Sequence, residues 1–458
     1  MVARARAVAF QIILEVSSTD AHSDDLLRSR QVDALTQQDR ALATTLVLGT
    51  LRWQIRLDEQ VRPLLTRPDA KLPPAVEAAL RLGAYQLLYL DRIPVYAAIG
   101  ESVELAKQAG ESHAARMVNA VLRKLGRLPH ESPPPKAKDA AEIAASYAHP
   151  QWVVDRWSRV YGLETAQAIC RFDQEPAAIT IRLLDPDTER DLADEGIGLE
   201  PGEVLTAARR IASGDIIRSK AFREGRIRIQ DEGSQLVAEL AGAASRINAN
   251  GKIGARGRIL DTCAAPGGKT AILAERNPEA SITAWDISKR RLEAMRRTLA
   301  PSGDRIRLEV RDATEGNLQP EYDLILCDVP CTGTGTIARN PEIRFRVSEQ
   351  EIARQHARQV RILSSAMSGL AASGRLLYST CSLEPEENKA VVAECLNANP
   401  QFTSHSLADE IEKLAAAGIL THAAATRLIA SAIRDGFLRT IPGIHNCDGF
   451  FAALLTRK

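Results

Sequence analysis

The first part of the chain shows a helical pattern of apolar positions. From Val2 to Leu128 apolar residues recur three and four positions apart, as in VEAALRLGAYQLLYL, and no segment alternates clearly between apolar and polar residues. This spacing places the apolar side chains on one face of successive helices. The pattern therefore predicts an all-helical domain over residues 1–128.

The helical pattern ends at a proline-rich stretch. The sequence LPHESPPPKAK contains three consecutive prolines, which cannot continue a helix, and we interpret residues 129–145 as a linker. Beyond it, HPQWVVDRWSRVYG predicts a helix, whereas AAITIRLL and GRIRIQD are rich in β-branched residues and predict strands. Residues 146–240 are therefore expected to form a small α+β domain.

A third pattern begins at Gly257, where short apolar runs alternate with helical stretches. The runs are RILD, SITAWD, RIRLEVRD, YDLILCD and GRLLYSTC. Strands that alternate with helices indicate a mostly parallel sheet with helices on both faces, so residues 241–458 are expected to form an α/β domain. The segment 407–435 predicts an additional helix pair, to which we assign no function.

Each of these apolar runs ends near an acidic residue or a cysteine. In parallel sheets, ligands bind at the edge formed by the carboxyl ends of the strands. An aspartate at such a position serves about as often only as a helix N-cap, but its repetition at successive strand ends favours a site. The residues expected to converge at this edge are Asp261, Asp286, Asp312, Asp328 and Cys381.

The composition is that of a soluble, multidomain globular protein. The chain has 458 residues, of which 45% are hydrophobic and 26% are charged. No apolar run reaches the roughly 18 residues of a membrane span, so we expect a cytoplasmic protein without a membrane partner. The seven cysteines are an odd number without a CxxC pattern, which argues against a disulfide framework and predicts no metal site.

The charge of the chain leaves its partner open. The net charge is +1, but residues 206–228 contain seven Arg or Lys against two acids, and residues 339–361 contain six Arg against three Glu. A solvated face and a surface that contacts phosphates are equally good interpretations of these stretches.

The stretch LDTCAAPGGKT, Leu260–Thr270, is the most specific motif of the chain. It predicts a strand, a turn of small residues and a helix that begins near Lys269, where backbone amides approach a ligand. A triphosphate loop would require a glycine in place of Cys263, and the dinucleotide motif G-x-G-x-x-G is absent. The loop therefore suits a nucleoside without a triphosphate, with Asp286 near its ribose hydroxyls and Asp312 near its base.

The stretch DVPCTGTG, Asp328–Gly335, joins a carboxylate, a proline turn and a cysteine. Taken alone, Cys331 is more often a buried apolar thiol than a nucleophile. Cys381 follows the next predicted strand, however, so two thiols are expected at the edge where the nucleoside would bind. That pairing points to covalent chemistry.

These motifs resemble those of a known family. LDTCAAPGGKT, DVPCTGTG and YSTCSLEPEEN, with GTIARNPEIRFR and DGFFAALL, resemble the RNA cytosine-5 methyltransferases that use S-adenosylmethionine. The N-terminal stretches LGTLRW, LRLGAYQLLYL and MVNAVLRKL resemble the helical RNA-binding domain of the antitermination factor NusB. The combination is similar to the bacterial 16S ribosomal RNA cytosine-5 methyltransferases. It implies a NusB-like domain at 1–128, a small α+β RNA-binding subdomain at 146–240 and a Rossmann-like methyltransferase domain at 241–458.

The resemblance implies a reaction and a role for each thiol. C5 of cytosine is a poor nucleophile until a thiolate adds at C6. By the family pattern Cys381 attacks, Cys331 assists release of the product, and Asp328 hydrogen-bonds the N3/N4 edge of the ring. Residue types alone leave the order of the thiols open, because the DNA enzymes with this chemistry attack from their Pro-Cys cysteine.

The resemblance also implies a site for S-adenosylmethionine. The loop from Cys263 to Lys269 surrounds its methionine part, Asp286 lies on the ribose, Asp312 lies near the adenine, and Asp328 belongs to both sites. The implied cofactor-binding residues are Cys263, Ala264, Ala265, Pro266, Gly267, Gly268, Lys269, Asp286, Asp312 and Asp328.

The implied partner is 16S ribosomal RNA, bound by a monomer. A sister enzyme that methylates transfer RNA is one alternative, which the NusB-like domain disfavours by analogy. A non-catalytic antitermination or ribosome-assembly factor is the other, which the intact Cys331, Cys381 and Asp328 disfavour. Relatives often carry Arg-x-Asn on the first strand of the middle domain, where this chain has Arg182 and Leu184, so we expect one RNA or interdomain contact to be missing.

Overall fold

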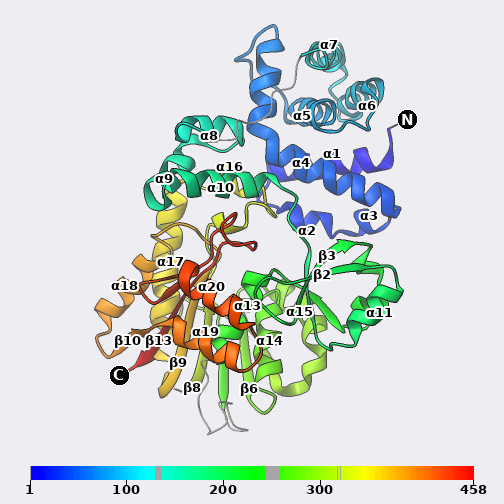
Figure 1. The fold of residues 1–458 in the computed structure, drawn as a ribbon. Helices are drawn as coiled ribbons and strands as arrows, with labels where there is room; N and C mark the ends of the chain where they lie inside the picture. Colours follow the sequence, from blue (N-terminus) through cyan, green and yellow to red (C-terminus); the bar gives the residue numbers. More distant parts are fainter. Residues whose placement is uncertain (1, 129–136, 244–256, 317, 320) are drawn as a thin grey trace. The chain divides into compact units, whose positions relative to one another are not determined.

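The computed structural model describes residues 2–128, 137–243, 257–316, 318–319 and 321–458. The chain forms two compact units, and many of their helices and strands are labelled in Figure 1. The first contains Met1–Ala177 and Ile337–Arg346, and the second contains Ala178–Thr336 and Val347–Lys458. The chain therefore leaves the second unit and returns to it within the range predicted as one α/β domain.

The first unit is helical, as the apolar spacing predicted. Its core contains side chains from several helices, including Phe10, Ile13, Leu46, Leu51 and Leu80, all of which are buried. Its helices are α1 (Arg4–Ser18), α2 (Ser23–Leu27), α3 (Arg30–Asp33), α4 (Gln37–Val61), α5 (Pro74–Tyr89), α6 (Val95–Gln108), α7 (Ala115–Leu125), α8 (Ala140–Ser146), α9 (Gln151–Tyr161), α10 (Leu163–Gln174) and α16 (Ile343–Arg346), with short 3-10 turns at Arg62–Leu64 and Ser112–Ala114.

The first part of the predicted linker 129–145, residues 129–136, lies outside the described residues. The last part of the linker begins α8, because the side chain of Asp139 accepts a hydrogen bond from the backbone N–H of Glu142 and so caps that helix. Helices α8, α9 and α10 belong to the first compact unit, although they follow the proline-rich stretch. The compact units are defined by which residues pack together, not by their order in the sequence. The predicted domain boundaries at 128, 145 and 240 stay predictions.

The second unit begins with a small antiparallel sheet of strand order β2-β3-β1-β4. Two of its strands correspond to the predicted runs AAITIRLL and GRIRIQD. The elements are β1 (Thr180–Leu183), α11 (Thr188–Asp194), β2 (Gly198–Pro201), β3 (Ala208–Ser213), a 3-10 turn (Ile216–Arg218), α12 (Lys220–Arg223) and β4 (Ile227–Ile229).

The larger sheet of this unit has the order β11-β12-β13-β9-β8-β5-β6-β7, and β10 pairs with β13. The strands β9, β8, β5, β6 and β7 are parallel and correspond to the five predicted runs, whereas β10 to β13 add an antiparallel part that the pattern had not predicted. The strands are β5 (Arg258–Asp261), β6 (Ser281–Asp286), β7 (Ile306–Val310), β8 (Tyr322–Asp328), β9 (Leu370–Thr380), β10 (Phe402–His405), β11 (Ile433–Arg434), β12 (Phe437–Arg439) and β13 (Phe451–Arg457).

Helices cover both faces of the parallel strands (Figure 1). Side chains of a strand point alternately to the two faces, so Ile259 belongs to a core cluster with residues of α13, α14 and α19, while the adjacent Leu260 belongs to a second cluster with residues of α17 and α18. None of the helices in the described ranges has the length and apolar character needed to cross a membrane. The helices are α13 (Glu232–Ala243), α14 (Gly268–Arg276), α15 (Lys289–Leu299), α17 (Glu349–Ser368), α18 (Lys389–Ala398), α19 (Leu407–Ala416) and α20 (His422–Ala432), with 3-10 turns at Ala300–Arg305 and Thr334–Thr336.

The candidate active site at the strand ends

The carboxyl ends of four parallel strands position the candidate residues. Asp261, Asp286 and Asp328 are the last residues of β5, β6 and β8, and Cys381 directly follows β9. The strands are neighbours in the order β9-β8-β5-β6 and pair in parallel, so their ends lie along one edge. The structure therefore brings these four predicted residues to the same edge of the sheet.

Asp312 lies differently, because β7 ends two residues earlier at Val310. Its carboxylate accepts a hydrogen bond of 2.9 Å from the backbone N–H of Thr314 and so forms a local turn. That N–H is the main cause that lowers the pKa of Asp312, and the guanidinium groups of Arg358 and Arg361 also lower it. The structure thus places Asp312 beyond a strand end rather than at one.

The geometry of the loop after β5 favours glycine at two positions. Gly267 has a φ of 101°, and a Cβ atom there would lie 2.6 Å from Cγ of Met295. A Cβ atom on Gly268 would lie 3.0 Å from the side chain of Gln230. The loop is also fixed to the next strand, because the N–H of Ala264 donates to the carbonyl of Trp285 at 2.7 Å.

The end of β6 has the features of a nucleoside site. The buried carboxylate of Asp286 accepts hydrogen bonds from the N–H groups of Ala265 (3.3 Å) and Ser288 (2.9 Å), and Nη1 of Arg291 forms an ion pair with its Oδ2 at 3.4 Å. Its two oxygens keep lone pairs that can accept further hydrogen bonds. Two apolar side chains near these strand ends are exposed, Ile287 by 55% and Val310 by 58%. The carboxylate can accept hydrogen bonds from ribose hydroxyl groups, and the exposed apolar side chains can contact a base. Together they fit the nucleoside part of S-adenosylmethionine.

An ion pair joins the glycine loop to the end of β8. Nζ of Lys269 lies 2.8 Å from Oδ2 of Asp328, whose other oxygen accepts a hydrogen bond of 2.6 Å from the hydroxyl of Ser379. Burial lowers the pKa of Lys269, but the charge of Asp328 and its hydrogen bond outweigh burial, so the pKa is raised overall. The Cys381 thiol also contributes to this upward shift, so the ammonium group lies within electrostatic reach of that thiol.

Asp261 is almost completely buried, and the charges of Lys269 and Asp328 both act on it. Its Oδ2 accepts a hydrogen bond of 2.7 Å from the hydroxyl of Thr270, while Oδ1 has no partner among the described residues. Burial raises the pKa of Asp261 to about 7, and the neighbouring carboxylate of Asp328 adds to the increase. Asp261 is therefore expected to exchange its proton near neutral pH.

The Asp261→Asn variant should lose part of the pH dependence of folding. A carboxyl with a pKa of about 7 in the folded state stabilises the protein below its ordinary pKa of 3.8, and this contribution is lost as the pH rises through 7. Asparagine does not titrate. The free energy of unfolding of the variant, relative to that of wild type, should therefore rise by roughly 2–3 kcal/mol between pH 5 and pH 8, at about 1.4 kcal/mol per pKa unit. Urea denaturation at both pH values measures this difference. The exposed Asp304→Asn is the control, and an equal difference at the two pH values for Asp261→Asn would contradict the assignment.

The two predicted thiols lie in contact. Sγ of Cys331 and Sγ of Cys381 are 3.2 Å apart, and both residues are partly buried. The hydrogen bond with Cys381 and burial raise the pKa of Cys331 well above the ordinary value of a thiol. Cys331 is therefore expected to keep its proton, which makes it a hydrogen-bond donor toward the sulfur of Cys381.

A buried carboxylate, Glu387, connects the loops that carry the two thiols. It accepts hydrogen bonds from the backbone N–H of Thr332 (2.9 Å) and from Nε2 of Gln359 (3.0 Å), and the hydroxyl groups of Thr332 and Ser382 also donate to it. Thr332 follows Cys331, and Ser382 follows Cys381. Burial raises the pKa of Glu387, although these donors oppose the shift. Glu387 thus fixes the two loops relative to each other.

Sequence reasoning did not identify Glu387. The signal was the acidic block EPEEN shortly after Cys381, but only the fold shows that Glu387 is the acid of this block that bonds to both thiol loops. Cys263, which was predicted near the cofactor, does not join the thiol pair, and burial raises its pKa to about 12. It is expected to stay a neutral thiol beside the glycine loop.

The basic stretch at 206–228 is largely neutralised by acids from other elements. Four of its arginines form ion pairs of 2.6–2.9 Å, which are Arg209 with Glu189, Arg210 with Glu200, Arg226 with Asp191 and Arg228 with Glu275. The arginines of this stretch therefore mainly form ion pairs within the protein, which disfavours the interpretation of the stretch as a surface that contacts phosphates.

Helix α15 presents a basic surface that the sequence analysis did not single out. Arg290, Arg296 and Arg297 are exposed, and none forms a hydrogen bond or ion pair with a described residue. The helix contains a single acid, Glu293, whose carboxylate lies 4.0 Å from Nζ of Lys289. It begins at Lys289, three residues after β6 ends at Asp286, so its first turn follows the candidate edge closely along the chain.

Comparison with known proteins finds two families along the chain. Residues 252–456 match the family described as "16S rRNA methyltransferase RsmB/F", and residues 3–127 match the NusB family. The matched ranges correspond to the two motif groups on which the resemblance was based. The predicted fold class is confirmed, with a helical NusB-like part and a Rossmann-like methyltransferase part.

Full-length relatives show the same combination. The chain is 32% identical to a "Probable ribosomal RNA small subunit methyltransferase B" of Bacillus subtilis (strain 168), over 99% of this chain and 98% of the relative. It is 32% identical to the "Ribosomal RNA small subunit methyltransferase B" of Pseudomonas putida, over 83% and 86% of the two chains. The crystal structure of PH0851 has the same fold, with a TM-score of 0.80 and 23% identity over 99% of this chain and 98% of that one.

The cofactor of this methyltransferase family is S-adenosylmethionine, and the end of β6 with the glycine loop suits it. Identity above 30% over nearly the full length of a relative, together with both family matches, decides the assignment. The chain belongs to the family of the ribosomal RNA small subunit methyltransferases B.

Proposed function

We propose that this protein transfers a methyl group from S-adenosylmethionine to C5 of a cytosine in 16S ribosomal RNA through a covalent cysteine adduct. The observation that carries the proposal is the pair of thiols 3.2 Å apart beside the Lys269–Asp328 ion pair. A purely RNA-binding protein has no use for two thiols in contact at this edge. The family and the names of its relatives support ribosomal RNA as the substrate.

In the first proposed step the sulfur of Cys381 forms a bond to C6 of the cytosine. The electrons of the C5–C6 double bond then make C5 nucleophilic. Asp328 is proposed to bind the N3/N4 edge of the ring, which draws electrons from C6 and helps the addition.

The second step forms the C5–methyl bond while the bond between this methyl group and the cofactor sulfur breaks, so the cofactor would leave as S-adenosylhomocysteine. S-adenosylmethionine supplies an electrophilic methyl group. Asp286 and the glycine loop up to Lys269 are proposed to orient this group, with Asp328 positioned between base and cofactor. Asp312 is proposed to lie near the adenine, although its observed hydrogen bond is to the local backbone.

The last step releases the product. A base removes the proton from C5, the C5–C6 double bond forms again, and the electron pair of the C6–S bond returns to Cys381. The protonated thiol of Cys331 stabilises this leaving sulfur by a hydrogen bond, since its pKa is raised and the two sulfur atoms are in contact. This order of the thiols follows the family pattern.

The experiment that tests the function uses S-adenosylmethionine with a labelled methyl group and 16S RNA that lacks modifications. Labelled 5-methylcytosine in this RNA is the expected product, identified after digestion by mass spectrometry. Label in transfer RNA but not in 16S RNA would assign the sister activity. Binding of both RNAs without transfer to either would support the non-catalytic factor instead.

The Glu387→Gln variant should lower turnover without weakening the cofactor site. Its amide keeps one acceptor oxygen but directs an NH₂ group at donors, so the loops of Cys331 and Cys381 lose their common anchor. We expect kcat to fall about 10- to 100-fold, as a misplacement of about 1 Å suffices for such a loss, with a KM for S-adenosylmethionine near wild type. Glu394→Gln, on the partly exposed surface of α18, is the matched control. Wild-type kcat in Glu387→Gln would remove Glu387 from the proposal.

Helix α15 is proposed to contact the phosphates of the RNA. Replacing Arg290, Arg296 and Arg297 by Gln should raise the KM for RNA several-fold and leave kcat unchanged. The slope of log affinity against log salt should fall by about 0.7–0.9 for each phosphate that the variant no longer neutralises. Arg354→Gln, on the exposed face of α17, serves as control. An unchanged salt dependence in the triple variant would show that α15 is only a solvated helix.

A further inference from the structure

The segment that follows the Cys331 loop belongs to the helical unit. Residues Ile337–Arg346 pack with Met1–Ala177, whereas the residues on both sides of the segment belong to the methyltransferase unit. The turn Thr334–Thr336 ends directly before it, so no linker separates the Cys331 loop from the segment. We name Ile337–Arg346 the anchor segment.

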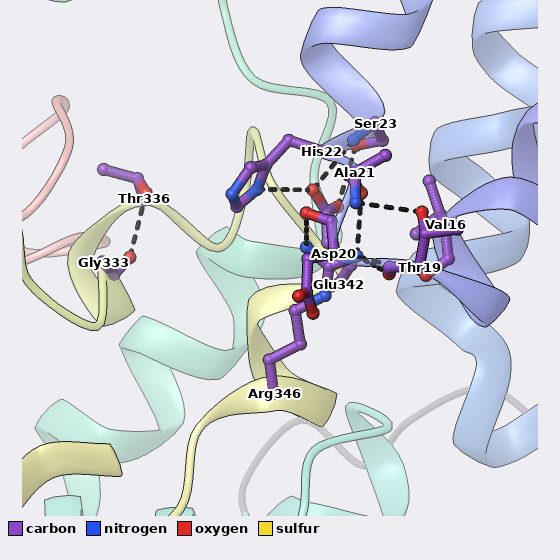
Figure 2. A network of polar contacts seen from close by, with 10 residues as sticks. All are labelled: Val16, Thr19, Asp20, Ala21, His22, Ser23, Gly333, Thr336, Glu342 and Arg346. Atoms are coloured by element: carbon purple, nitrogen blue, oxygen red, sulfur yellow. Dashed lines mark hydrogen bonds and ion pairs between the residues drawn. The ribbon is translucent and has the colours of Figure 1, made fainter. Parts of the chain in front are cut away.

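Glu342 fixes the anchor segment to the start of α2. Its carboxylate, which is buried, accepts hydrogen bonds from the N–H (2.9 Å) and the hydroxyl (2.8 Å) of Ser23, and Nδ1 of His22 lies at 3.3 Å (Figure 2). Burial raises the pKa of Glu342, but the donors from His22 and Ser23 outweigh burial and lower it overall. Glu342 is therefore an ionised carboxylate in a site built by the helical unit.

Arg346 binds the end of α1. Its guanidinium group donates to the carbonyl oxygens of Val16 (3.1 Å), Thr19 (3.2 Å), Asp20 (3.2 Å) and Ala21 (2.8 Å), as Figure 2 shows. The last carbonyl groups of a helix lack partners within the helix and carry partial negative charge, so a cation there is favourable. Arg346 thus acts as a C-terminal cap for α1 from a distant part of the chain.

Arg344 lies inside the helical unit and is only 1% exposed. It donates to the carbonyl oxygens of Arg52 (2.8 Å) and Ala148 (3.0 Å), while Arg52 donates to the carbonyl oxygen of Ala338 at 2.8 Å. Burial lowers the pKa of Arg344 to about 10, and its Nε and Nη2 find no partner among the described residues. A buried cation with unused donors lowers the stability of the fold relative to an apolar side chain. We therefore expect Arg344 to serve mainly by fixing the anchor segment in a single position within the helical unit.

We infer that the helical unit positions Cys331 through the anchor segment, and that product release therefore depends on this unit. Cys331 is connected on one side to strand β8 and on the other, through Thr336, to the anchor segment. The thiol acts only if its sulfur stays in contact with that of Cys381, and a misplacement of about 1 Å can lower a rate by 10²-fold. Glu342 and Arg346 are thus positioning residues, and this inference rests on the proposed function.

The kinetic test uses the full chain with the variants Glu342→Gln and Arg346→Ala. Stopping single turnovers with denaturant gives the rates at which the protein–RNA adduct forms and decays. We expect adduct formation within about 2-fold of wild type and decay about 10-fold slower, because the release step requires Cys331. Arg81→Lys is the control for general destabilisation, since Arg81 pairs with Asp58 at 2.8 Å inside the helical unit and has no part in the anchor segment.

A second readout does not require the enzyme to be active. Diamide removes two electrons and two protons from a pair of thiols, which become a disulfide while diamide is reduced to the hydrazine. Without RNA, wild type and Arg81→Lys should cross-link Cys331 to Cys381 at the same rate, and Glu342→Gln and Arg346→Ala should do so several-fold more slowly. Peptide mass analysis measures this cross-link.

The outcomes separate the two proposals. Equal cross-linking rates and equal adduct decay in all variants would overturn the positioning role of the anchor segment while the methyltransferase function stands. Slower cross-linking in the anchor variants without adduct in any protein would overturn the covalent mechanism while the positioning role stands. Slower decay in Arg81→Lys as well would show that the effect reflects stability alone.

Discussion

The Cys381→Ala variant is expected to lose methyl transfer by roughly 10³-fold or more, because it lacks the sulfur that adds to C6 in the proposed first step. Cys331→Ala, in contrast, should still form the adduct but release it slowly, since the departing sulfur of Cys381 loses its donor at 3.2 Å. Labelled methyl transfer to 16S RNA measures the first effect. Denaturing gel electrophoresis measures the trapped protein–RNA adduct.

The control for both variants is Cys395→Ala, because Cys395 is a buried thiol on α18 that contacts Ser364 rather than the thiol pair. It should methylate RNA at a rate near wild type. An adduct with Cys381→Ala and none with Cys331→Ala would reverse the order of the thiols. Methylation by both variants would exclude the covalent mechanism.

The second large effect is expected for Asp328→Asn. The change removes the charge that pairs with Lys269 at 2.8 Å and an acceptor for the edge of the base. Removal of one electrostatic contact to a reacting group typically costs 10²- to 10³-fold in kcat, and we expect a loss of about this size. Thermal denaturation in parallel separates this loss from an effect on folding.

A double-mutant cycle with Lys269→Gln tests whether the two residues act as a unit. The combined loss should be far smaller than the product of the single losses, because either change already breaks the ion pair. Asp323→Asn is a suitable control, since Asp323 is on the same strand and binds the backbone N–H of Arg258. Turnover of Asp328→Asn within a few-fold of wild type would contradict the proposed role of Asp328.

Local sequence signals predicted the strand ends well where periodicity and special residues acted together. The runs that end in Asp261, Asp286 and Asp328 are short, apolar and followed by helix signals, and they became parallel strands. The prediction for Asp312 placed it at a strand end, but pairing of β6 with β7 stops where Asp286 lies opposite Val310. Where a strand ends depends on how far the neighbouring strand of the sheet pairs with it. The run RIRLEVRD alone carries no information about that neighbouring strand.

By itself, the sequence determined the helical character of the N-terminal part, the α/β pattern with its glycine loop, and the motifs that identify the family. These are local properties, since a repeat of three to four residues and a glycine with positive φ are properties of short segments. Only the tertiary structure decided that Glu387 joins the two thiol loops and that acids of other elements neutralise the basic stretch at 206–228. It alone also placed the anchor segment Ile337–Arg346 in the helical unit. Such contacts join residues far apart in the chain, and burial and charge choose among many partners of the same type, so no short segment specifies them.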